Sequence, residues 1–349
     1  MSSLVMGVIK EIRAQQSLVG DEANLRRPTV LLDNGAAIAI GEELGSQAAR
    51  SLLDELRDKN VPIAFRMGEI GATEVFIVQR WVVKEILDED ATGVAVEFLI
   101  SHARHVLPRE NPDFDRIMDE LRRSHQLGDS VMVAEDDGHH ILEVWRSGAQ
   151  PKFLKPAEGQ PGGTGTPLTN VTSAQAQALF ISMQQSDCDV GDVVAPCIPF
   201  DFPDDGCWGR AHEMCRRIAA TGTIPGKVWN YGRLMAASRN NPKCAVQWFW
   251  HVAPTLSAAG ADGVEQTVVL DPSLFDRVVS VEEWHAVQGD AAAQLASSSW
   301  EIFHRNADGA STTDPTFGQT EHVLQTYRLA LKARIAQSGP PPYAACQLL

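Results

Sequence analysis

The hydrophobic pattern of residues 25–90 is repeated in residues 91–147. Each stretch opens with a strand-like apolar run, continues with an amphipathic helical pattern and closes with two further strand-like runs. Both helical patterns contain the sequence Asp-Glu-Leu-Arg, at residues 54–57 and 119–122. The apolar positions that share this spacing are Leu52, Leu53 and Leu56 in the first helix and Ile117, Met118 and Leu121 in the second. The pattern therefore predicts two similar small α+β modules, which are either an internal duplication or alike by chance.

The pattern changes after residue 147. Residues 148–170 are rich in glycine, proline and threonine, which predicts a linker or a long surface loop. The third region opens with a helical pattern that Ser173 is placed to cap, and it closes with another at residues 321–337. We therefore expect an α+β protein with an N-terminal module, a second module, a linker, a larger domain and a loose tail, at residues 1–90, 91–147, 148–170, 171–337 and 338–349.

A helical pattern in the third region begins directly after Gly206. Cys207 falls in its first turn, where the helix dipole and the unpaired backbone N–H groups favour a thiolate and can bind an oxyanion. Asp204 and Asp205 precede the helix, where they either raise the pKa of the thiol or cap the helix. Cys207 is thus a candidate nucleophile, and the alternative is a buried thiol that has no chemistry.

The base that a nucleophilic thiol needs is predicted on an aromatic strand, CAVQWFWHVAPTL, at residues 244–256. This strand carries His251, and Pro254 is expected to end it. His212 lies five residues after Cys207, about 140° around an ideal helix, so it points elsewhere. His251 is therefore the candidate base, and the alternative is a histidine that belongs to the core.

A second apolar strand pattern follows and ends at Asp271-Pro272. If the two strands are antiparallel neighbours, Asp271 lies near His251. A carboxylate there fixes the tautomer of the imidazole and stabilises its cation. A cysteine at a helix start, a histidine on one strand and an aspartate at the end of the next is the layout of papain-like thiol enzymes.

Composition and charge narrow the possible partners and the cellular location. The 349-residue chain has a formal net charge of −15, which argues against nucleic acid or an anionic membrane as a partner. The N-terminal sequence lacks the features of a secretory signal, so we expect a cytoplasmic location with all six cysteines free. Cys197 and Cys244 are expected to pair only under oxidising conditions. Without a Cys-x-x-Cys pair, we expect no metal and no cofactor.

Three separated segments resemble the bacterial protein-glutamine glutaminase family, whose members are papain-like and transglutaminase-like thiol enzymes. The segments are PCIPFDFPDDGCWGRAHEM, CAVQWFWHVA and VVLDPSLFDRVVSVEEW. The resemblance covers residues 171–305 and implies a catalytic domain in which the helix that carries the cysteine packs on an antiparallel sheet. It also implies that Cys207, His251 and Asp271 form a triad, which removes the side-chain amide nitrogen of glutamine through a thioester.

The segment VAVEFLISHARHVLPRENPDFDRIMDEL, residues 94–121, is similar to the pro-region of the same family. In the family's precursor the pro-region lies over the active site. The resemblance therefore implies that a short part of this segment covers the cleft, namely Ser101, His102, Ala103 and Arg104.

Trp208, Arg210 and Trp250 adjoin the candidate triad in the sequence and are candidates for substrate binding or support of the site. The expected substrate is a glutamine-containing protein, peptide or small molecule. Two alternatives stay open: an acyltransferase that passes the same thioester to an amine and forms an amide or lactam, and a non-catalytic interaction protein. The sequence does not determine the oligomeric state.

Overall fold

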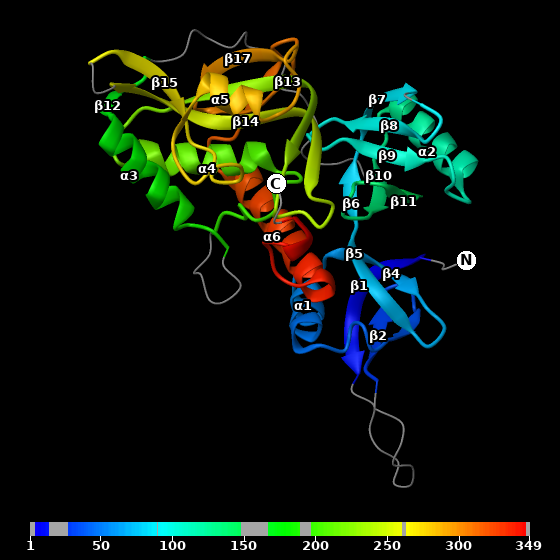
Figure 1. The fold of residues 1–349 in the computed structure, drawn as a ribbon. Coiled ribbons are helices and arrows are strands. Elements are labelled where there is room, and N and C mark those ends of the chain that lie inside the picture. Colours follow the sequence, from blue (N-terminus) through cyan, green and yellow to red (C-terminus); the bar gives the residue numbers. More distant parts are fainter. Residues whose placement is uncertain are drawn as a thin grey trace. The chain divides into compact units, whose positions relative to one another are not determined.

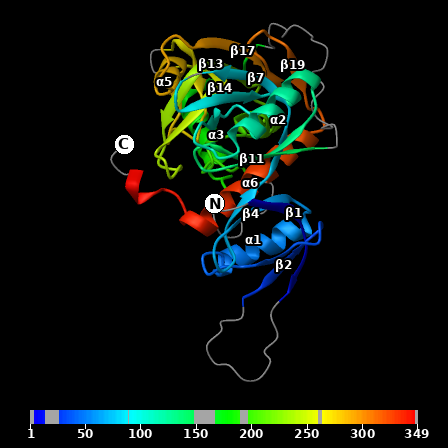
Figure 2. The same ribbon diagram turned by 90° about the vertical axis from the view of Figure 1, so that its right-hand side faces the viewer.

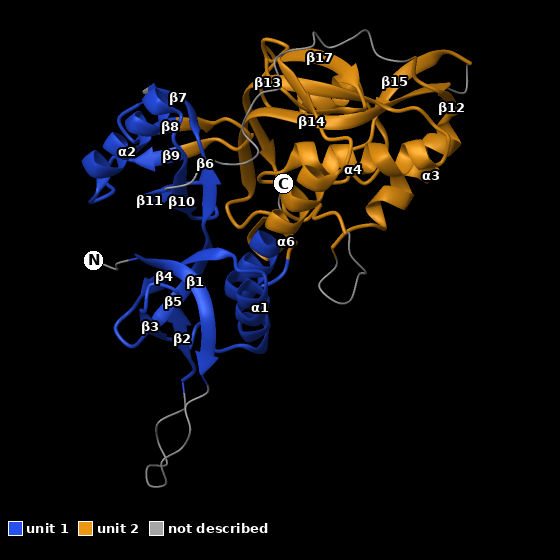
Figure 3. Cartoon of the chain, turned by 180° about the vertical axis from the view of Figure 1, so that it is seen from behind, with its two compact units in different colours: residues 1–95, 106–150, 329–340 blue, residues 96–105, 151–328, 341–349 orange. Residues whose placement is uncertain are grey.

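The computed structural model describes residues 4–13, 27–88, 90–147, 167–188, 197–259 and 263–346. These residues form six α-helices and several mainly antiparallel sheets, which confirms the predicted α+β class. Two compact units are built from interleaved segments (Figure 3). Unit 1 contains residues 1–95, 106–150 and 329–340, and unit 2 contains residues 96–105, 151–328 and 341–349. This division differs from the contiguous boundaries that we expected from the sequence.

The first half of unit 1 is a five-stranded sheet with one helix. Its elements are β1 (Leu4–Arg13), β2 (Thr29–Leu32), β3 (Ala37–Ala39), α1 (Gln47–Asp58), β4 (Pro62–Met67) and β5 (Ala72–Ile77). The strand order is β3-β2-β1-β4-β5, so the long strand β1 is central. It pairs with β4 through its first half and with β2 through its second half, antiparallel in both cases.

Helix α1 covers one face of this sheet (Figure 1; Figure 2). Ser46 begins the helix because its hydroxyl accepts a hydrogen bond from Ala49 N at 3.1 Å. Leu52, Leu53 and Leu56 are buried in the core that α1 shares with the strands. The helical spacing of apolar positions therefore predicted the buried face of α1 correctly.

Residues 79–146 repeat this arrangement. Their elements are β6 (Gln79–Trp81), β7 (Val83–Asp88), β8 (Gly93–Phe98), β9 (His105–Pro108), α2 (Phe114–Leu127), β10 (Val131–Glu135) and β11 (Ile141–Arg146). The strand orders are β11-β10-β6 and β7-β8-β9. Only Val82 separates β6 from β7, and together they take the place of β1: β6 pairs with β10 as β1 pairs with β4, and β7 lies beside β8 as β1 lies beside β2. The shared topology favours an internal duplication over chance similarity.

Unit 2 is built on a six-stranded sheet. Its strands are β12 (Asn170–Thr172), β13 (Gly226–Ala237), β14 (Ala245–Ala259), β15 (Glu265–Val269), β16 (Val279–Ser280) and β17 (Gln294–Ser299). The order is β16-β15-β14-β13-β17, with β12 parallel to β14 and the other pairs antiparallel. The remaining elements are α3 (Ser173–Gln184), α4 (Cys207–Ala220), α5 (Val281–Ala286), β18 (Ile302–Arg305), β19 (Ser311–Thr313), α6 (Gly318–Ser338) up to residue 328, and a 3-10 turn (Ala344–Cys346). The rest of α6 belongs to unit 1.

Helix α4 lies against β14 on one face of the sheet (Figure 1). The core between helices and sheet contains Phe180 from α3, Met214 and Ile218 from α4, and Leu256 from β14. Burial of these side chains fixes α4 across the strand, since an apolar helix face and an apolar sheet face stabilise each other by leaving water together.

Two local predictions about unit 2 are wrong. Thr172, and not Ser173, caps α3, because the Thr172 hydroxyl accepts a hydrogen bond from Gln175 N at 3.2 Å. Pro254 does not end β14, which continues to Ala259. A strand tolerates proline where no N–H donor is needed, and the Pro254 carbonyl still accepts a hydrogen bond from Leu270 N at 3.0 Å.

Four of the six cysteines are paired, as Cys188–Cys197 and Cys244–Cys346. The prediction that all six are free is therefore wrong, and Cys197 and Cys244 pair with other partners than each other. The error came from the expected cytoplasmic location, in which thiols are kept reduced. That location stays a prediction. Cys207 and Cys215 are free and buried.

The end of the chain is attached to unit 2 as far as residue 346. The prediction of a loose tail at residues 338–349 is therefore wrong up to that residue. The disulfide holds Cys346, and Tyr343 N donates a hydrogen bond to Arg239 O at 2.8 Å. Among the described residues, we find no helix with the length and apolar character needed to cross a membrane.

Candidate active site

Cys207 begins α4, as predicted, and its side chain is buried. The turn before it requires glycine, because Gly206 has a φ of 82° and a Cβ there would meet the ring of Tyr327 at 2.3 Å. The predicted capping by Asp204 or Asp205 is wrong, since no side-chain cap bond is made at this helix start. Asp205 Oδ1 instead accepts a hydrogen bond from Gly206 N at 2.9 Å, which supports the turn itself.

Strands β14 and β15 bring His251 and Asp271 together. The strands are antiparallel, with Thr255 opposite Val269, so the chain leaving β15 passes the middle of β14. His251 Nε2 lies 2.8 Å from Asp271 Oδ2. Trp284 Nε1 donates a second hydrogen bond to the same oxygen at 2.9 Å. The carboxylate is therefore held from two sides.

Flat aromatic rings hold the imidazole of His251 in place. Its ring stacks on that of Trp248, with centroids 4.4 Å apart and planes 11° apart. The ring of Trp284 lies 5.5 Å away at 23°. Because the ring is stacked and bonded to Asp271 through Nε2, its orientation is fixed and Nδ1 is the nitrogen that points away from the carboxylate.

A thiol and two imidazoles meet at the start of α4. The Sγ of Cys207 and one ring nitrogen each of His102 and His251 all lie within 4.8 Å of one another, and all three residues are buried. His251 Nδ1 is buried without a hydrogen-bond partner in the structure. Since Nε2 is engaged with Asp271, Nδ1 is the nitrogen that is available to the thiol.

The electrostatic environment keeps Cys207 protonated and Asp271 ionised in this state of the protein. Burial raises the pKa of the Cys207 thiol well above its ordinary value, against the opposing effect of the Arg210 charge. This overturns the expectation that the helix start alone yields a thiolate. Burial also raises the pKa of Asp271, but the charge and hydrogen bond of His251 and the bond from Trp284 outweigh it, so this pKa is lowered.

The segment of Ser101, His102, Ala103 and Arg104 lies on the edge of β14. Ala103 pairs with Trp248 as an antiparallel bridge. Arg104 N donates to Gln247 O at 2.9 Å, and Phe249 N donates to His102 O at 2.9 Å. The segment is therefore added to β14 as a short strand beside the candidate site.

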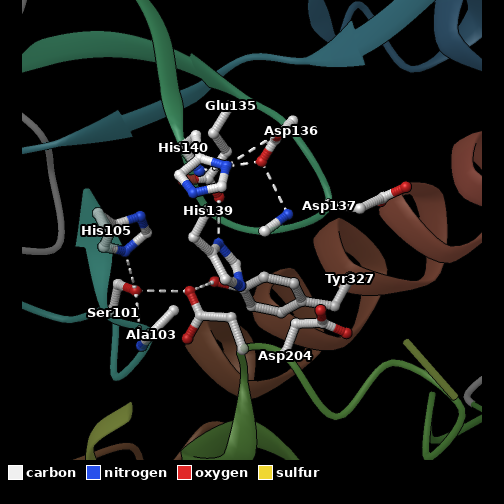
Figure 4. A network of polar contacts seen from close by, with 12 residues as sticks. Ser101, Ala103, His105, Glu135, Asp136, Asp137, His139, His140, Asp204 and Tyr327 are labelled. Atoms are coloured by element: carbon white, nitrogen blue, oxygen red, sulfur yellow. Dashed lines mark hydrogen bonds and ion pairs between the residues drawn. The ribbon is translucent and has the colours of Figure 1, made fainter. Parts of the chain in front are cut away.

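A buried network anchors the same segment through Asp205. Ser101 Oγ donates to Asp205 Oδ2 at 2.6 Å, and His102 N donates to Asp205 Oδ1 at 3.1 Å. Tyr327 Oη also donates to Asp205 Oδ2, at 2.5 Å. Ser101 Oγ lies 2.7 Å from His105 Nε2 as well (Figure 4). Asp205, which supports the turn before Cys207, thus also binds Ser101 and His102.

The three predicted supporting residues are all buried. Arg210 donates through Nη1 to the carbonyls of Phe202 and Asp205, at 2.8 and 2.6 Å, so it orients the loop that precedes Cys207. Trp208 and Trp250 pack on each other with ring centroids 5.8 Å apart. In this state of the protein they form part of the packed interior of unit 2.

His212 is a structural hydrogen-bond partner, as the sequence indicated. Lys227 Nζ lies 2.9 Å from His212 Nδ1. Burial and the charge of Lys227 lower the pKa of His212 to about 3, so the ring is neutral. Burial lowers the pKa of Lys227 to about 8 and raises that of Cys215 to about 12.

Sequence reasoning missed the roles of Asp205, Trp284 and Tyr327. The sequence offers Asp205 as a helix cap or as a charge that raises the pKa of the thiol, and nothing in a local pattern shows that it binds a segment 104 residues away. Trp284 lies in the segment VVLDPSLFDRVVSVEEW, which also contains Asp271. Its hydrogen bond to Asp271 depends on how the chain turns between these two residues. A tyrosine in α6 carries no local feature that links it to a turn before α4.

Comparisons with known proteins show what family and fold the chain resembles. Residues 176–288 match the protein-family model described as Glutaminase. Among solved structures, pro-protein-glutaminase and its A47Q2 mutant are each similar, with a TM-score of 0.55 and 23% identity over 76% of this chain and 97% of that chain. A structure of protein-glutaminase covers 47% of this chain and 90% of its own, with 28% identity and a TM-score of 0.42. No curated protein matches the sequence.

The chain therefore has the fold of pro-protein-glutaminase. Residues 176–288, which include Cys207, His251 and Asp271, match the Glutaminase family model, and the resemblance to protein-glutaminases that the three sequence segments indicated is confirmed.

Proposed function

We propose that the protein is a cysteine-dependent amidohydrolase that deamidates glutamine side chains, with Cys207 as nucleophile, His251 as base and Asp271 as the group that orients the base. One observation carries the proposal: His251 holds Asp271 through Nε2 at 2.8 Å and has an unpartnered Nδ1, and a ring nitrogen of this residue lies within 4.8 Å of the Cys207 Sγ. This is the arrangement of a papain-like or transglutaminase-like triad.

The first half of the reaction forms a thioester. His251 Nδ1 takes the proton of the Cys207 thiol, and the thiolate attacks the amide carbon of the glutamine side chain. The backbone N–H groups at the start of α4 stabilise the oxyanion that develops. The C–N bond then breaks, and His251 returns the proton to the nitrogen, which leaves as ammonia.

The second half hydrolyses the thioester. Water enters as ammonia leaves, and His251 Nδ1 takes a proton from it. The resulting hydroxide attacks the acyl carbon, the C–S bond breaks, and His251 returns the proton to the leaving sulfur, which forms glutamate and restores the free thiol. Asp271 stays ionised throughout because its lowered pKa favours the carboxylate beside the imidazolium.

We infer further that Ser101 to Arg104 inhibit the enzyme by covering it, as the pro-region resemblance implies. Cys207 N lies 3.5 Å from His102 Nε2, so the covering segment contacts one of the N–H groups that the oxyanion needs. The segment also supplies a backbone strand along β14, the position in which an extended substrate peptide would be bound. The substrate is therefore proposed to be a glutamine in a protein or peptide.

Ammonia release from carboxybenzyl-Gln-Gly tests the proposal. The full chain is compared with the same chain cut at a protease site introduced into residues 148–166. Cleavage is expected to raise the rate, and Cys207→Ala to lower the rate of the cut form by about 10³-fold or more. Cys215→Ala, at the other buried thiol, is the matched control and should keep the activity. Activity that survives Cys207→Ala would reject the triad, and hydroxamate without ammonia release in hydroxylamine would favour the acyltransferase.

A further inference from the structure

The covering segment adds a third potential metal ligand, His102, to Cys207 and His251 of the candidate active site. The donor atoms are the Sγ of Cys207 and one nitrogen each of His102 and His251, all within 4.8 Å of one another and all buried. A thiolate and two neutral imidazoles are ligands that Zn²⁺ prefers. Neither proposed role requires a thiol together with two imidazoles. Catalysis uses His251 and not His102, and the covering segment is held by backbone hydrogen bonds and by Asp205.

Both imidazoles are oriented as zinc ligands are. His251 Nε2 is hydrogen-bonded to the Asp271 carboxylate at 2.8 Å, which leaves the lone pair on Nδ1. His102 Nδ1 lies 2.9 Å from Trp250 O, so it donates to that carbonyl and the lone pair is on Nε2. Cys207 N donates a long hydrogen bond of 3.5 Å to this Nε2, which a bound ion would replace. A carboxylate or carbonyl behind the ring is the usual outer partner of a metal-binding histidine, because it fixes the tautomer and raises the basicity of the other nitrogen.

The size and charge of the site fit one small cation. Zinc bonds of about 2.3 Å to sulfur and 2.0 Å to nitrogen place tetrahedral ligands about 3.5 Å apart. The three donors lie within 4.8 Å of one another, so they need to close by roughly 1.3 Å at most. Asp205 Oδ1 lies 3.4 Å from His102 Nε2 and adds negative charge at the site. His251 Nδ1, which is buried and unpartnered, gains a partner when an ion binds.

We propose that the covered form of this protein binds one Zn²⁺ ion through Cys207, His251 Nδ1 and His102 Nε2. The ion links the covering segment to the nucleophile and its base. It therefore inhibits the enzyme and also strengthens the binding of the covering segment. Bound metal keeps the thiol deprotonated but unable to attack, because its lone pair is donated to zinc. Loss of the ion and release of residues 101–104 are then coupled. The proposal uses the same thiol and imidazole as the proposed function but does not depend on deamidation.

Cobalt substitution tests the site directly. Metal-free full chain is titrated with Co²⁺, and absorption is recorded in the near ultraviolet, where thiolate-to-cobalt charge transfer appears, and in the visible, where tetrahedral Co²⁺ absorbs strongly. We expect one equivalent to bind with a Kd below about 1 μM, and one equivalent of Zn²⁺ to displace it. A titration without a charge-transfer band, or with a Kd above about 100 μM, would overturn the proposal.

Three variants assign the ligands. Cys207→Ser should abolish the charge-transfer band while changing the volume of the side chain little. His102→Gln should weaken Co²⁺ binding at least about tenfold and leave Cys207 and His251 in place. His285→Gln, a half-buried histidine of α5, is the matched control and should bind Co²⁺ as the unaltered chain does. If His102→Gln binds Co²⁺ with unchanged affinity and spectrum, the covering segment is not a ligand and the proposal is wrong.

The outcomes separate this proposal from the proposed function. Cobalt binding with the expected variants but no ammonia release after cleavage supports the metal site alone. Ammonia release that needs Cys207, in a chain without a cobalt–thiolate band, supports the enzyme alone. A circular-dichroism melt of each variant shows whether it folds, and Cys207→Ser keeps the test decisive if His102→Gln does not fold.

Discussion

The two halves of unit 1 have one topology but different connections between their paired strands. In the first half, Asp33 to Ala36 join β2 to β3 in a tight turn, closed by a bond from Leu32 N to Ala36 O at 2.9 Å. In the second half, the chain leaves β8 for unit 2 and returns at β9, so residues 96–105 belong to unit 2 (Figure 3). The comparison shows that the two halves differ at this connection, which in the second half runs beside β14 of unit 2.

The cores of the two halves do not account for this difference. Leu56 in α1 and Leu121 in α2 occupy the same place in the shared Asp-Glu-Leu-Arg sequence, and both are fully buried. Each half therefore folds around an equivalent apolar helix face. What distinguishes the second half is the chemistry of Ser101 and His102, which lie outside that core.

The largest expected effect comes from replacing the connection between β8 and β9 with the short turn that joins β2 to β3. Replacement of residues 99–104 by the four-residue sequence of residues 33–36 removes the bonds to β14 and to Asp205. With several hydrogen bonds lost at about 1 kcal/mol each, we expect ammonia release from carboxybenzyl-Gln-Gly by the uncut chain to rise about 100-fold.

The reciprocal change is the control for this exchange. A Gly-Ser turn in place of residues 33–36 alters the first half and should leave ammonia release at its basal rate. If both exchanges raise the rate equally, the cover is not specific to the second connection.

Equivalent core truncations should have equal effects on stability and unequal effects on activity. Leu56→Ala and Leu121→Ala each remove a buried side chain, which is expected to lower the free energy of unfolding by about 2–5 kcal/mol. Only Leu121→Ala destabilises the second half of unit 1, whose strands β8 and β9 flank the proposed covering segment. Only this variant should therefore raise ammonia release. Urea denaturation and the ammonia assay on both variants check this, and an equal rise in activity would contradict it.

A single hydroxyl should have a smaller effect. Ser101→Ala removes the hydrogen bond to Asp205 Oδ2, and a bond to a buried carboxylate is worth about 1.5–3 kcal/mol. We expect basal ammonia release to rise about tenfold. Ser130→Ala, at another buried serine of the second half, is the control. An unchanged rate in Ser101→Ala would show that the backbone strand alone holds the cover.

The smallest effect is expected at the turn before β11. Burial alone raises the pKa of Asp136, but hydrogen bonds from His140 and Gly138 outweigh it, so the pKa is lowered. The stabilisation is therefore present above the unfolded pKa of 3.8 and is lost as the pH falls through the folded pKa.

We expect Asp136→Asn to lower the free energy of unfolding by about 1 kcal/mol at neutral pH. In acid, the difference in this free energy between the variant and the unaltered chain should disappear. Urea denaturation at neutral pH and in acid measures both values. The matching turn of the first half is closed by its backbone, with Gly68 N bonded to Gly71 O at 2.8 Å. Glu69→Gln in that turn should accordingly change little at either pH, and a constant difference for Asp136→Asn would contradict the assignment.

Local pattern predicted those parts of the fold that local interactions determine. The apolar stripes of α1 and α2, the start of α4 at Cys207 and the strands around His251 and Asp271 all follow from spacing and turn residues. The repeated element order was also visible, because the two helices share a sequence at the same position.

Long-range features could not be predicted in this way. The disulfides depend on which cysteines the fold brings together, and the expectation of free thiols came from a predicted location rather than from geometry. Sequence patterns for zinc look for closely spaced ligands, whereas His102 and Cys207 are 105 residues apart. The proposed covering role of residues 101–104 follows only from a family resemblance, since no pattern shows where Ser101 is anchored.

The Cys244–Cys346 bridge has a practical consequence for anyone who handles this protein. It closes a ring across 102 residues of the chain, and that ring includes His251 and Asp271. By the loop-closure estimate, a ring of this size contributes about 4–5 kcal/mol. Dithiothreitol, which is routinely added to keep a nucleophilic cysteine reduced, would also reduce this disulfide. Protein purified with dithiothreitol and protein purified without it are therefore chemically different, and their thermal stabilities have to be measured separately.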